Sequence, residues 1–231
     1  MADDQGKQAA PASETFDWPK YMARVDASVS AAEQHLEVPA GTISSIPSEP
    51  DFIATVKAYA VVEPILNELI AAHPSQVSSF GTLAPPEQDD AFRTFVTALR
   101  ISGEAGKIRL AKGWGLLPDW QVQFIQALAR VRNRYAHNVK NMHRSLTEIL
   151  TEEQRSNQKI VAHLTGLQAT LPLPSLLDSD RLIKSFMYHR LADYLAGALH
   201  TLRPPPSPAG GMLAELFAHG LDRHQESTAP K

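Results

Sequence analysis

The amino-acid sequence predicts an all-α helical bundle, of up-and-down connectivity, with flexible N- and C-terminal extensions. In several segments apolar residues recur at steps of three and four, the spacing that places them on one face of a helix. No segment alternates apolar and polar residues as a half-buried strand would, and no internal repeat is present. Apolar residues make up 43% of the 231 positions, which is enough for the core of one domain.

Composition divides the chain into three parts. Residues 1–14 are polar, show no periodicity and lack the apolar stretch of a secretory signal, so a disordered tail is expected. Residues 15–203 are expected to form the helical domain. Residues 204–231 are expected to form a proline-rich linker, a short amphipathic helix and a tail. The short helix rests on four apolar residues: Leu213, Leu216, Phe217 and Leu221.

The first half of the domain predicts two helices, separated by a loop that ends at Pro50. The first helix should cover residues 17–36. The second should cover residues 51–73, with Pro64 introducing a kink. Its apolar face would consist of Phe52, Val56, Tyr59, Val62, Leu66 and Leu69.

The second half predicts four more helices, over residues 88–112, 118–138, 145–166 and 179–202. The first of them is weakened near Gly103 and Gly106, and it should end at Gly113-Trp114-Gly115, because glycine readily takes the left-handed conformation of a helix end. Ser145 and Glu148 have the spacing of a capping box, which predicts a helix start.

Composition also limits the chemistry. The chain has no cysteine, so disulfides and thiolate sites are excluded, and a cytoplasmic location is expected. No apolar run approaches the length of a membrane span, so we expect no membrane partner. The nine histidines form no metal-ligand cluster, and no phosphate-binding loop occurs, so neither metal nor cofactor is expected.

Charge is unevenly distributed along the chain. Residues 91–144 contain ten Lys or Arg and only two acids, Glu104 and Asp119, for a local charge of +8. Because the whole chain carries −3, the remainder carries −11. Such segregation fits a surface for a polyanion, and it equally fits acidic helices packed beside basic ones.

The stretch RVRNRYAHNV, residues 130–139, concentrates polar residues in a helix whose neighbours are apolar. At about 100° per residue, Phe124, Leu128, Val131, Tyr135 and Val139 share one arc. Arg132 also lies in this arc, where an unpaired guanidinium would be costly. Glu63 lies on the apolar face of the 51–73 helix in the same way. We therefore expect Arg132 to pair with Glu63 or another internal carboxylate.

Asn133 and His137 are four residues apart and share the opposite face, where an Asn–His hydrogen bond would fix the imidazole tautomer. Arg132 and His137 differ in direction by about 140° in an unbroken helix, so one small ligand would not contact both. A dimer would remove this difficulty. The spacing alone favours His137 as a residue that interacts with the C-terminal end of the helix.

These residues resemble a known family. RNRYAH is similar to the Arg-x(4–6)-His signature of the HEPN superfamily of helical bundles. Over residues 102–139 the chain resembles the mannitol operon repressor-like (MltR-like) group within it, with Val131 in place of the usual Ile and Tyr135 in place of the usual Phe. The other matching positions are Lys107-Ile108, Leu110-Ala111 and Gly115-Leu116-Leu117.

The resemblance implies two functions of different class. In the first, the protein is a metal-independent, toxin-like endoribonuclease that acts as a homodimer. His137 would serve as general acid or base, Arg132 would hold the scissile phosphate, and Asn133 would orient His137. Non-specific phosphate contacts would come from Arg130, Arg134, Lys140 and Arg144. RNA would be the substrate, and an antitoxin a possible protein partner.

In the second, the protein is a non-catalytic regulator, similar to an operon repressor, that acts through protein partners. The sequence contains no second helix-turn-helix domain, so direct sequence-specific DNA readout is not supported. Here RNRYAH would lock helices together. The place of Arg132 in the apolar arc favours this second function, whereas the local +8 favours the nuclease. We prefer the regulator and keep both open.

Overall fold

The computed structural model describes residues 17–77, 86–101, 106–152, 154–167 and 180–202. These residues form helices and contain no strand, so the predicted all-α bundle is confirmed. The helices are α1 (Trp18–His35), α2 (Asp51–Val77), α3 (Pro86–Ala98), α4 (Lys107–Gly113), α5 (Asp119–Ala136), α6 (Leu146–Thr151), α7 (Gln154–Thr165) and α9 (Asp180–Leu202). Two 3₁₀ turns are η1 (Ile46–Ser48) and η2 (Val139–His143). The predicted tail over 1–14 and the linker and short helix over 204–231 lie outside the described residues.

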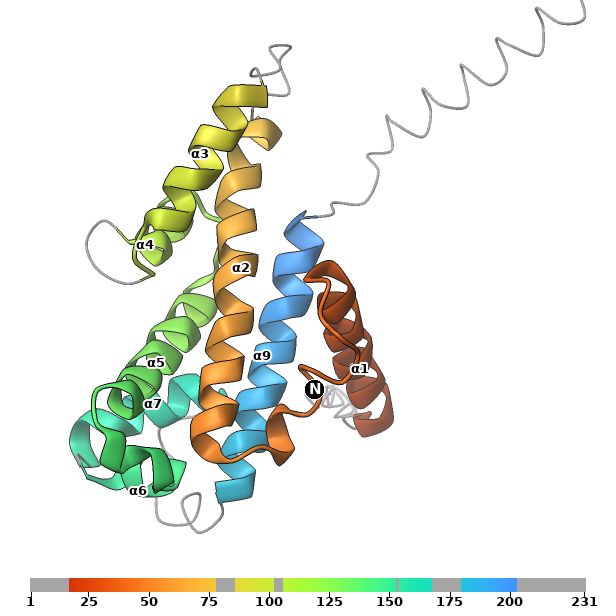
Figure 1. The fold of residues 1–231 in the computed structure, drawn as a ribbon. Coiled ribbons are helices and arrows are strands. Elements are labelled where there is room, and N and C mark those ends of the chain that lie inside the picture. Colours follow the sequence, from red (N-terminus) through yellow and green to blue (C-terminus); the bar gives the residue numbers. More distant parts are fainter. Residues whose placement is uncertain (1–16, 78–85, 102–105, 153, 168–179, 203–231) are drawn as a thin grey trace, which may run out of the picture.

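Helices α2 and α9 lie side by side at the centre of the bundle, and α1 covers the outer side of α9 (Figure 1). Lys184 near the start of α9 pairs with Asp51 at the start of α2, and Tyr194 donates to the Val62 carbonyl farther along both helices. The two helices therefore run parallel. Neighbours in an up-and-down bundle run antiparallel, so the central pair departs from the connectivity that we expected.

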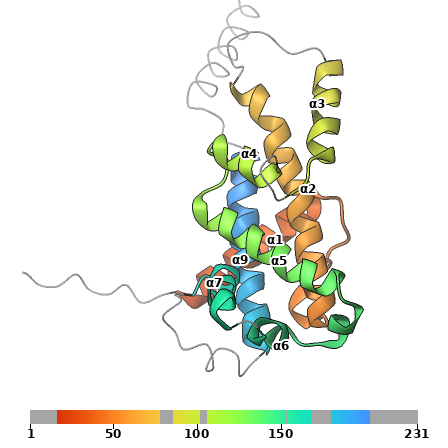
Figure 2. The ribbon, with the colours of Figure 1, turned by 90° about the vertical axis from the view of Figure 1, so that its left-hand side faces the viewer.

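The remaining helices pack around this pair. α3 lies along the C-terminal half of α2, while α5 packs on its N-terminal half (Figures 1 and 2). α7 contacts both α5 and α9, and α6 contacts α7 and α9. The side chains between the helices form one apolar core, in which Ile65, Leu66, Phe124, Leu128 and Leu195 are fully buried. Burying apolar surface of this extent is the main contribution to the stability of such a bundle.

Two predicted helices are each divided in the structure. The segment predicted over 88–112 forms α3 and α4, with Gly106 in extended conformation as the N-cap of α4. The segment predicted over 145–166 forms α6 and α7, and the buried side chain of Asn157 donates to the Leu150 carbonyl near the end of α6. A carbonyl left free where a helix ends requires such a donor, so the division is stabilised by the fold.

The local signals at helix ends are confirmed. Ser145 Oγ accepts from the Glu148 amide at 3.1 Å, and Glu148 Oε2 accepts from the Ser145 amide at 2.8 Å, which completes the capping box of α6. Gly115 has φ of 71°, a left-handed conformation that glycine adopts without strain, two residues after α4 ends.

A buried carboxylate organises the loop after α1. Glu33 is 6% exposed, and its two oxygens accept from the amides of Gly41 (3.0 Å), Ile43 (2.7 Å) and Ser44 (3.3 Å). These bonds replace the water that the carboxylate and the three amides lose on burial. Glu33 thus holds three successive parts of the loop between α1 and α2 in place.

Replacing Glu33 with glutamine is expected to lower the free energy of unfolding by about 1–3 kcal/mol, because the amide offers one acceptor oxygen where the carboxylate offers two. Urea unfolding followed by circular dichroism measures this loss. Glu37→Gln, at an exposed position four residues on, is the control and should stay within about 0.5 kcal/mol of the parent. Equal effects of the two changes would contradict the role given to Glu33.

Candidate functional site at the end of helix α5

Helix α5 presents its apolar face to the core as predicted. Phe124, Leu128, Val131 and Tyr135 are fully buried, and the ring of Tyr135 lies 5.7 Å from that of Phe52 on α2. Val139, which we expected in the same arc, is instead 72% exposed. The reason is that α5 ends at Ala136, so Val139 belongs to η2 and no longer follows the helical wheel.

Arg132 is half-buried and lies against α2. Its guanidinium carbon is 5.3 Å from the ring centroid of Tyr59, and Nη1 donates to Asn133 Oδ1 at 3.2 Å. A cation over an aromatic face contributes about 0.5–1 kcal/mol where water reaches the site, and more where it does not. The guanidinium is therefore held by contacts within the chain, on the side where α5 packs on α2.

The expected ion pair between Arg132 and Glu63 is not formed, because Glu63 pairs with Lys107 instead. Glu63 Oε1 accepts from Lys107 Nζ at 2.9 Å, and Lys107 Nζ also donates to the Thr97 carbonyl at 3.2 Å. Lys107 is fully buried at the start of α4. Because α4 packs on α2, it brings a lysine to the carboxylate that the sequence had assigned to Arg132.

Tyr59 lies between these charges, one helical turn before Glu63. Burial raises the pKa of the Tyr59 hydroxyl, the nearby Glu63 carboxylate raises it further, and Arg132 opposes both effects. The two misplaced charges that we identified in the sequence are therefore neighbours of the same ring, although they do not form the pair with each other that we expected.

His137 is the C-cap of α5. Its backbone amide donates to the Asn133 carbonyl at 2.9 Å, and its side chain is exposed. Among the described residues no hydrogen bond or ion pair reaches the imidazole, and the Asn133 side-chain oxygen accepts from Arg132. The predicted role of Asn133 in orienting His137 therefore has no contact to support it. The helix continues unbroken from Arg132 to Ala136, so the angular separation of about 140° persists within one chain.

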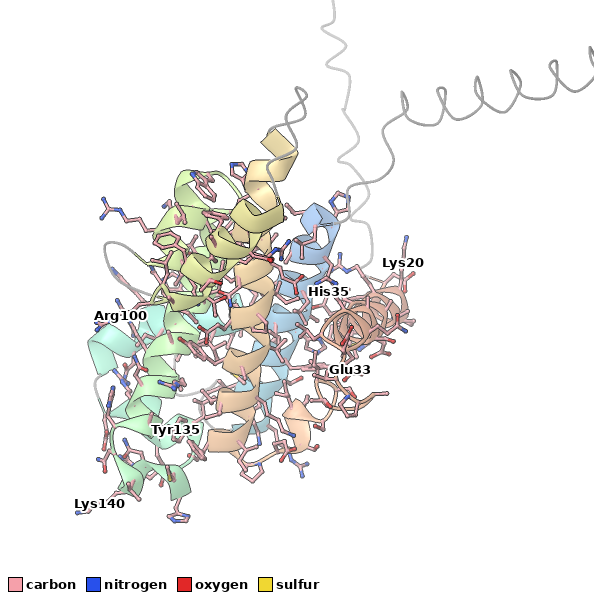
Figure 3. All side chains as sticks on the ribbon, turned by 45° about the horizontal axis from the view of Figure 1, so that its top comes forward. Lys20, Glu33, His35, Arg100, Tyr135 and Lys140 are labelled. Carbon is pink, nitrogen blue, oxygen red and sulfur yellow. The ribbon has the colours of Figure 1, made fainter. Side chains whose placement is uncertain are left out.

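The other predicted phosphate ligands are Arg130, Arg134, Lys140 and Arg144. Arg134 donates to the Ile149 carbonyl at 3.2 Å, and Arg144 pairs with Glu152. Arg130 is exposed on α5, and Lys140 is exposed in η2. Figure 3 shows Lys140 at the edge of the molecule, pointing away from it, whereas Tyr135 lies inside. Two of these residues, Arg134 and Arg144, thus contact the chain itself, and two are exposed.

Two contacts of this region were not predicted from the sequence. They are the contact of Lys107 with Glu63 and that of Arg190 of α9 with Trp120. Arg190 belongs to the polar Tyr188-His189-Arg190 run, and its guanidinium carbon lies 4.1 Å from the Trp120 ring centroid at the start of α5. An arginine in the middle of one helix and a tryptophan at the start of another carry no local signal that they will meet. In the described ranges no group of three or more His, Asp or Glu side chains is placed to hold a metal ion.

The fold and the site together define an all-α helical bundle in which most polar residues of the candidate motif contact the bundle itself. None of its helices, within the part that the structure describes, has the length and apolar character needed to cross a membrane. Comparison of the chain with models of protein families, with curated proteins and with solved structures gives no match.

Proposed function

We propose that the protein is a non-catalytic regulatory protein of the MltR-like kind, which acts in the cytoplasm by binding protein partners. One observation carries the proposal: the guanidinium of Arg132 lies over Tyr59 and donates to Asn133. A phosphate-binding arginine must direct its donors toward a ligand, whereas this guanidinium packs on a ring and directs one donor to its own chain. RNRYAH thus joins α5 to α2.

The surroundings of His137 support the same conclusion. A general base is usually held by a second group that fixes its tautomer and orientation, and Asn133 makes its side-chain bond to Arg132 instead. The position of His137 at the C-cap gives it a structural purpose, because a histidine there interacts favourably with the helix dipole.

The alternative is a metal-independent ribonuclease that uses Arg132 and His137 across a homodimer. It is favoured by the exposure of His137 and Arg130 and by the charge of +8 over residues 91–144. A second copy of the chain would have to supply the convergence that one copy lacks.

An RNA cleavage assay in EDTA tests the two functions. We expect the purified full-length protein to leave a labelled single-stranded RNA intact, and His137→Ala to be as stable as the parent within about 0.5 kcal/mol. Arg132→Ala should lower the free energy of unfolding by about 1–2 kcal/mol, through loss of the Tyr59 contact and the Asn133 hydrogen bond. The neighbouring exposed Arg130→Ala is the matched control and should be near neutral.

The structural role can be separated from general effects of charge. Tyr59→Leu and Arg132→Ala combined should cost less than the sum of the two single changes, since both remove the same contact. Cleavage of RNA in EDTA that disappears in both His137→Ala and Arg132→Ala, with the fold retained, would overturn the regulatory proposal and establish the nuclease.

A further inference from the structure

A group of basic residues lies away from RNRYAH, where three helices meet. It consists of Arg130 on α5, Lys159 and His163 on α7, and Arg190 on α9, and we call it the basic cluster. α7 packs against both α5 and α9 (Figure 2). Lys159 and His163 are four residues apart, so they share one face of α7. Arg130 and Lys159 are exposed, whereas His163 and Arg190 are half-buried.

Arg190 is held in a fixed position within this cluster. Its guanidinium carbon lies 4.1 Å from the centroid of the half-buried Trp120 ring. Gly166, whose φ is 73°, is also close: a Cβ added there would lie 3.2 Å from both the guanidinium carbon and Nε of Arg190. The absence of a side chain at residue 166 thus leaves room for the flat guanidinium. A planar group that is already packed against its neighbours loses little freedom on binding a ligand.

The hydrogen-bonding capacity of Arg190 is incompletely used. Its Nε is buried and has no acceptor among the described residues. A buried donor without an acceptor costs free energy, so such a group is retained where a ligand satisfies it or where its packing offsets the loss. The stack on Trp120 offsets part of the cost, and it gives Nε no acceptor.

The charges of the cluster act together at His163. Burial lowers the pKa of His163, and Arg130, Lys159 and Arg190 lower it further. In the described chain no carboxylate is among the groups that act on this imidazole. Burial and the three cations therefore all favour the neutral imidazole at His163.

Three cations elsewhere in the bundle are paired with carboxylates. Lys112 pairs with Asp119 at 2.8 Å, Arg24 with Asp193 at 3.0 Å, and Arg144 with Glu152. A nucleic-acid backbone needs a continuous basic track for successive phosphates. The basic cluster comprises four residues on three helices, so it fits a short anionic segment instead.

We propose that the basic cluster binds an acidic segment of a partner protein, with the guanidinium of Arg190 as its anchor. The inference rests on the proposed function and assigns the chemistry of the partner. Arg190 would bind one carboxylate of the partner through its hydrogen-bond donors. Trp120 would pack against the apolar stem of the same acidic residue of the partner. Arg130 and Lys159 attract further carboxylates, and neutral His163 supplies a hydrogen bond.

The test uses the full-length protein and a fluorescein-labelled hexaglutamate peptide, with fluorescence anisotropy at low salt. We expect saturable binding that Arg190→Gln weakens roughly tenfold and that Arg130→Gln or Lys159→Gln weakens by a few fold, as for the loss of one charge-assisted contact. Arg190→Lys should resemble Arg190→Gln more than the parent, because the planar fork is lost. Arg181→Gln removes an exposed charge from the same helix and should bind as the parent does.

A second measurement is independent of affinity. The pKa of His163, followed by NMR of its ring proton, should rise when saturating unlabelled hexaglutamate is added, because an anion stabilises the imidazolium. The rise should be absent in Arg190→Gln, with circular dichroism confirming that the variant is folded. If that variant does not fold, Arg190→Lys serves in its place.

Several outcomes overturn the proposal. These are no saturable binding, equal weakening by Arg181→Gln, an unchanged pKa of His163, or tighter binding of a hexauridylate RNA through the same residues. The RNA result would assign the cluster to nucleic acid instead. None of these results decides whether the protein cleaves RNA, so failure here remains distinct from failure of the regulatory function, which the EDTA assay tests.

Discussion

Asp51→Ala is expected to lower the free energy of unfolding by about 3–5 kcal/mol, the value typical of breaking a buried ion pair from one side. Asp51 Oδ1 pairs with Lys184 Nζ at 2.9 Å, and Oδ2 accepts from the Leu146 amide at 2.6 Å. One carboxylate therefore joins the start of α2 to α9 and to the first residue of α6. The side chains of Lys184 and Asp51 are only 12% and 11% exposed, so solvent screens the pair weakly.

The alanine variant would leave two groups poorly satisfied. Lys184 would retain its bond to the Glu49 carbonyl at 2.8 Å but lose its only carboxylate among the described residues. The Leu146 amide would lose its acceptor. Asp51→Asn should cost less than Asp51→Ala, because the amide oxygen can still accept from one of the two donors.

Urea unfolding followed by circular dichroism measures both effects. Asp119→Ala is the matched control, because Asp119 also pairs with a lysine, but with 74% of its side chain exposed. Exposed pairs contribute about 0–1 kcal/mol, so this variant should be nearly as stable as the parent. A loss below about 1 kcal/mol in Asp51→Ala would show that the link between α2, α6 and α9 is not important for stability.

The second large effect concerns Glu63 and Lys107, and it is expected to be asymmetric. Glu63→Ala should cost about 2–4 kcal/mol, because it leaves the fully buried ammonium of Lys107 with the Thr97 carbonyl as its remaining acceptor. Lys107→Met should cost less than about 1.5 kcal/mol. Methionine fills a similar volume, and the Glu63 side chain, 41% exposed, can be hydrated by water.

A double-mutant cycle tests this asymmetry. Once Lys107 is methionine, the further change Glu63→Ala should be nearly neutral, because no buried charge remains to be compensated. Chemical denaturation of the four proteins gives the coupling free energy directly. A larger loss for Lys107→Met than for Glu63→Ala would contradict the argument and place the main cost in packing around the lysine stem.

Helix starts and ends were largely predictable because their signals are local. The capping box of Ser145 and Glu148, the left-handed Gly115 and the apolar face of α5 are all encoded within a few residues. The break that divides α3 from α4 was predicted only as a weak point near Gly103 and Gly106, and the break between α6 and α7 was not predicted. The second break is stabilised by Asn157, a donor from the following helix that no local pattern identifies.

The sequence identified residues of the candidate site but not the residues with which they form contacts. The sequence identified Arg132 and Glu63 as charges on apolar faces, and the structure gives Tyr59 to the first and Lys107 to the second. Glu63 and Lys107 are 44 positions apart, and Asp51 and Leu146 are 95 apart. Contacts between distant residues depend on which helices pack together and on how far each helix is shifted along its neighbour. Many pairings of helices are compatible with the same apolar periodicity.

The sequence by itself determined that this protein is helical, where most of its helices begin and end, and which charges would need a partner in its core. Those properties follow from contacts within one or two helical turns. Only the tertiary structure decided the parallel packing of α2 and α9, the partners of the buried charges and the meeting of Arg130, Lys159, His163 and Arg190. These depend on contacts between distant segments, which form only when the whole bundle is packed.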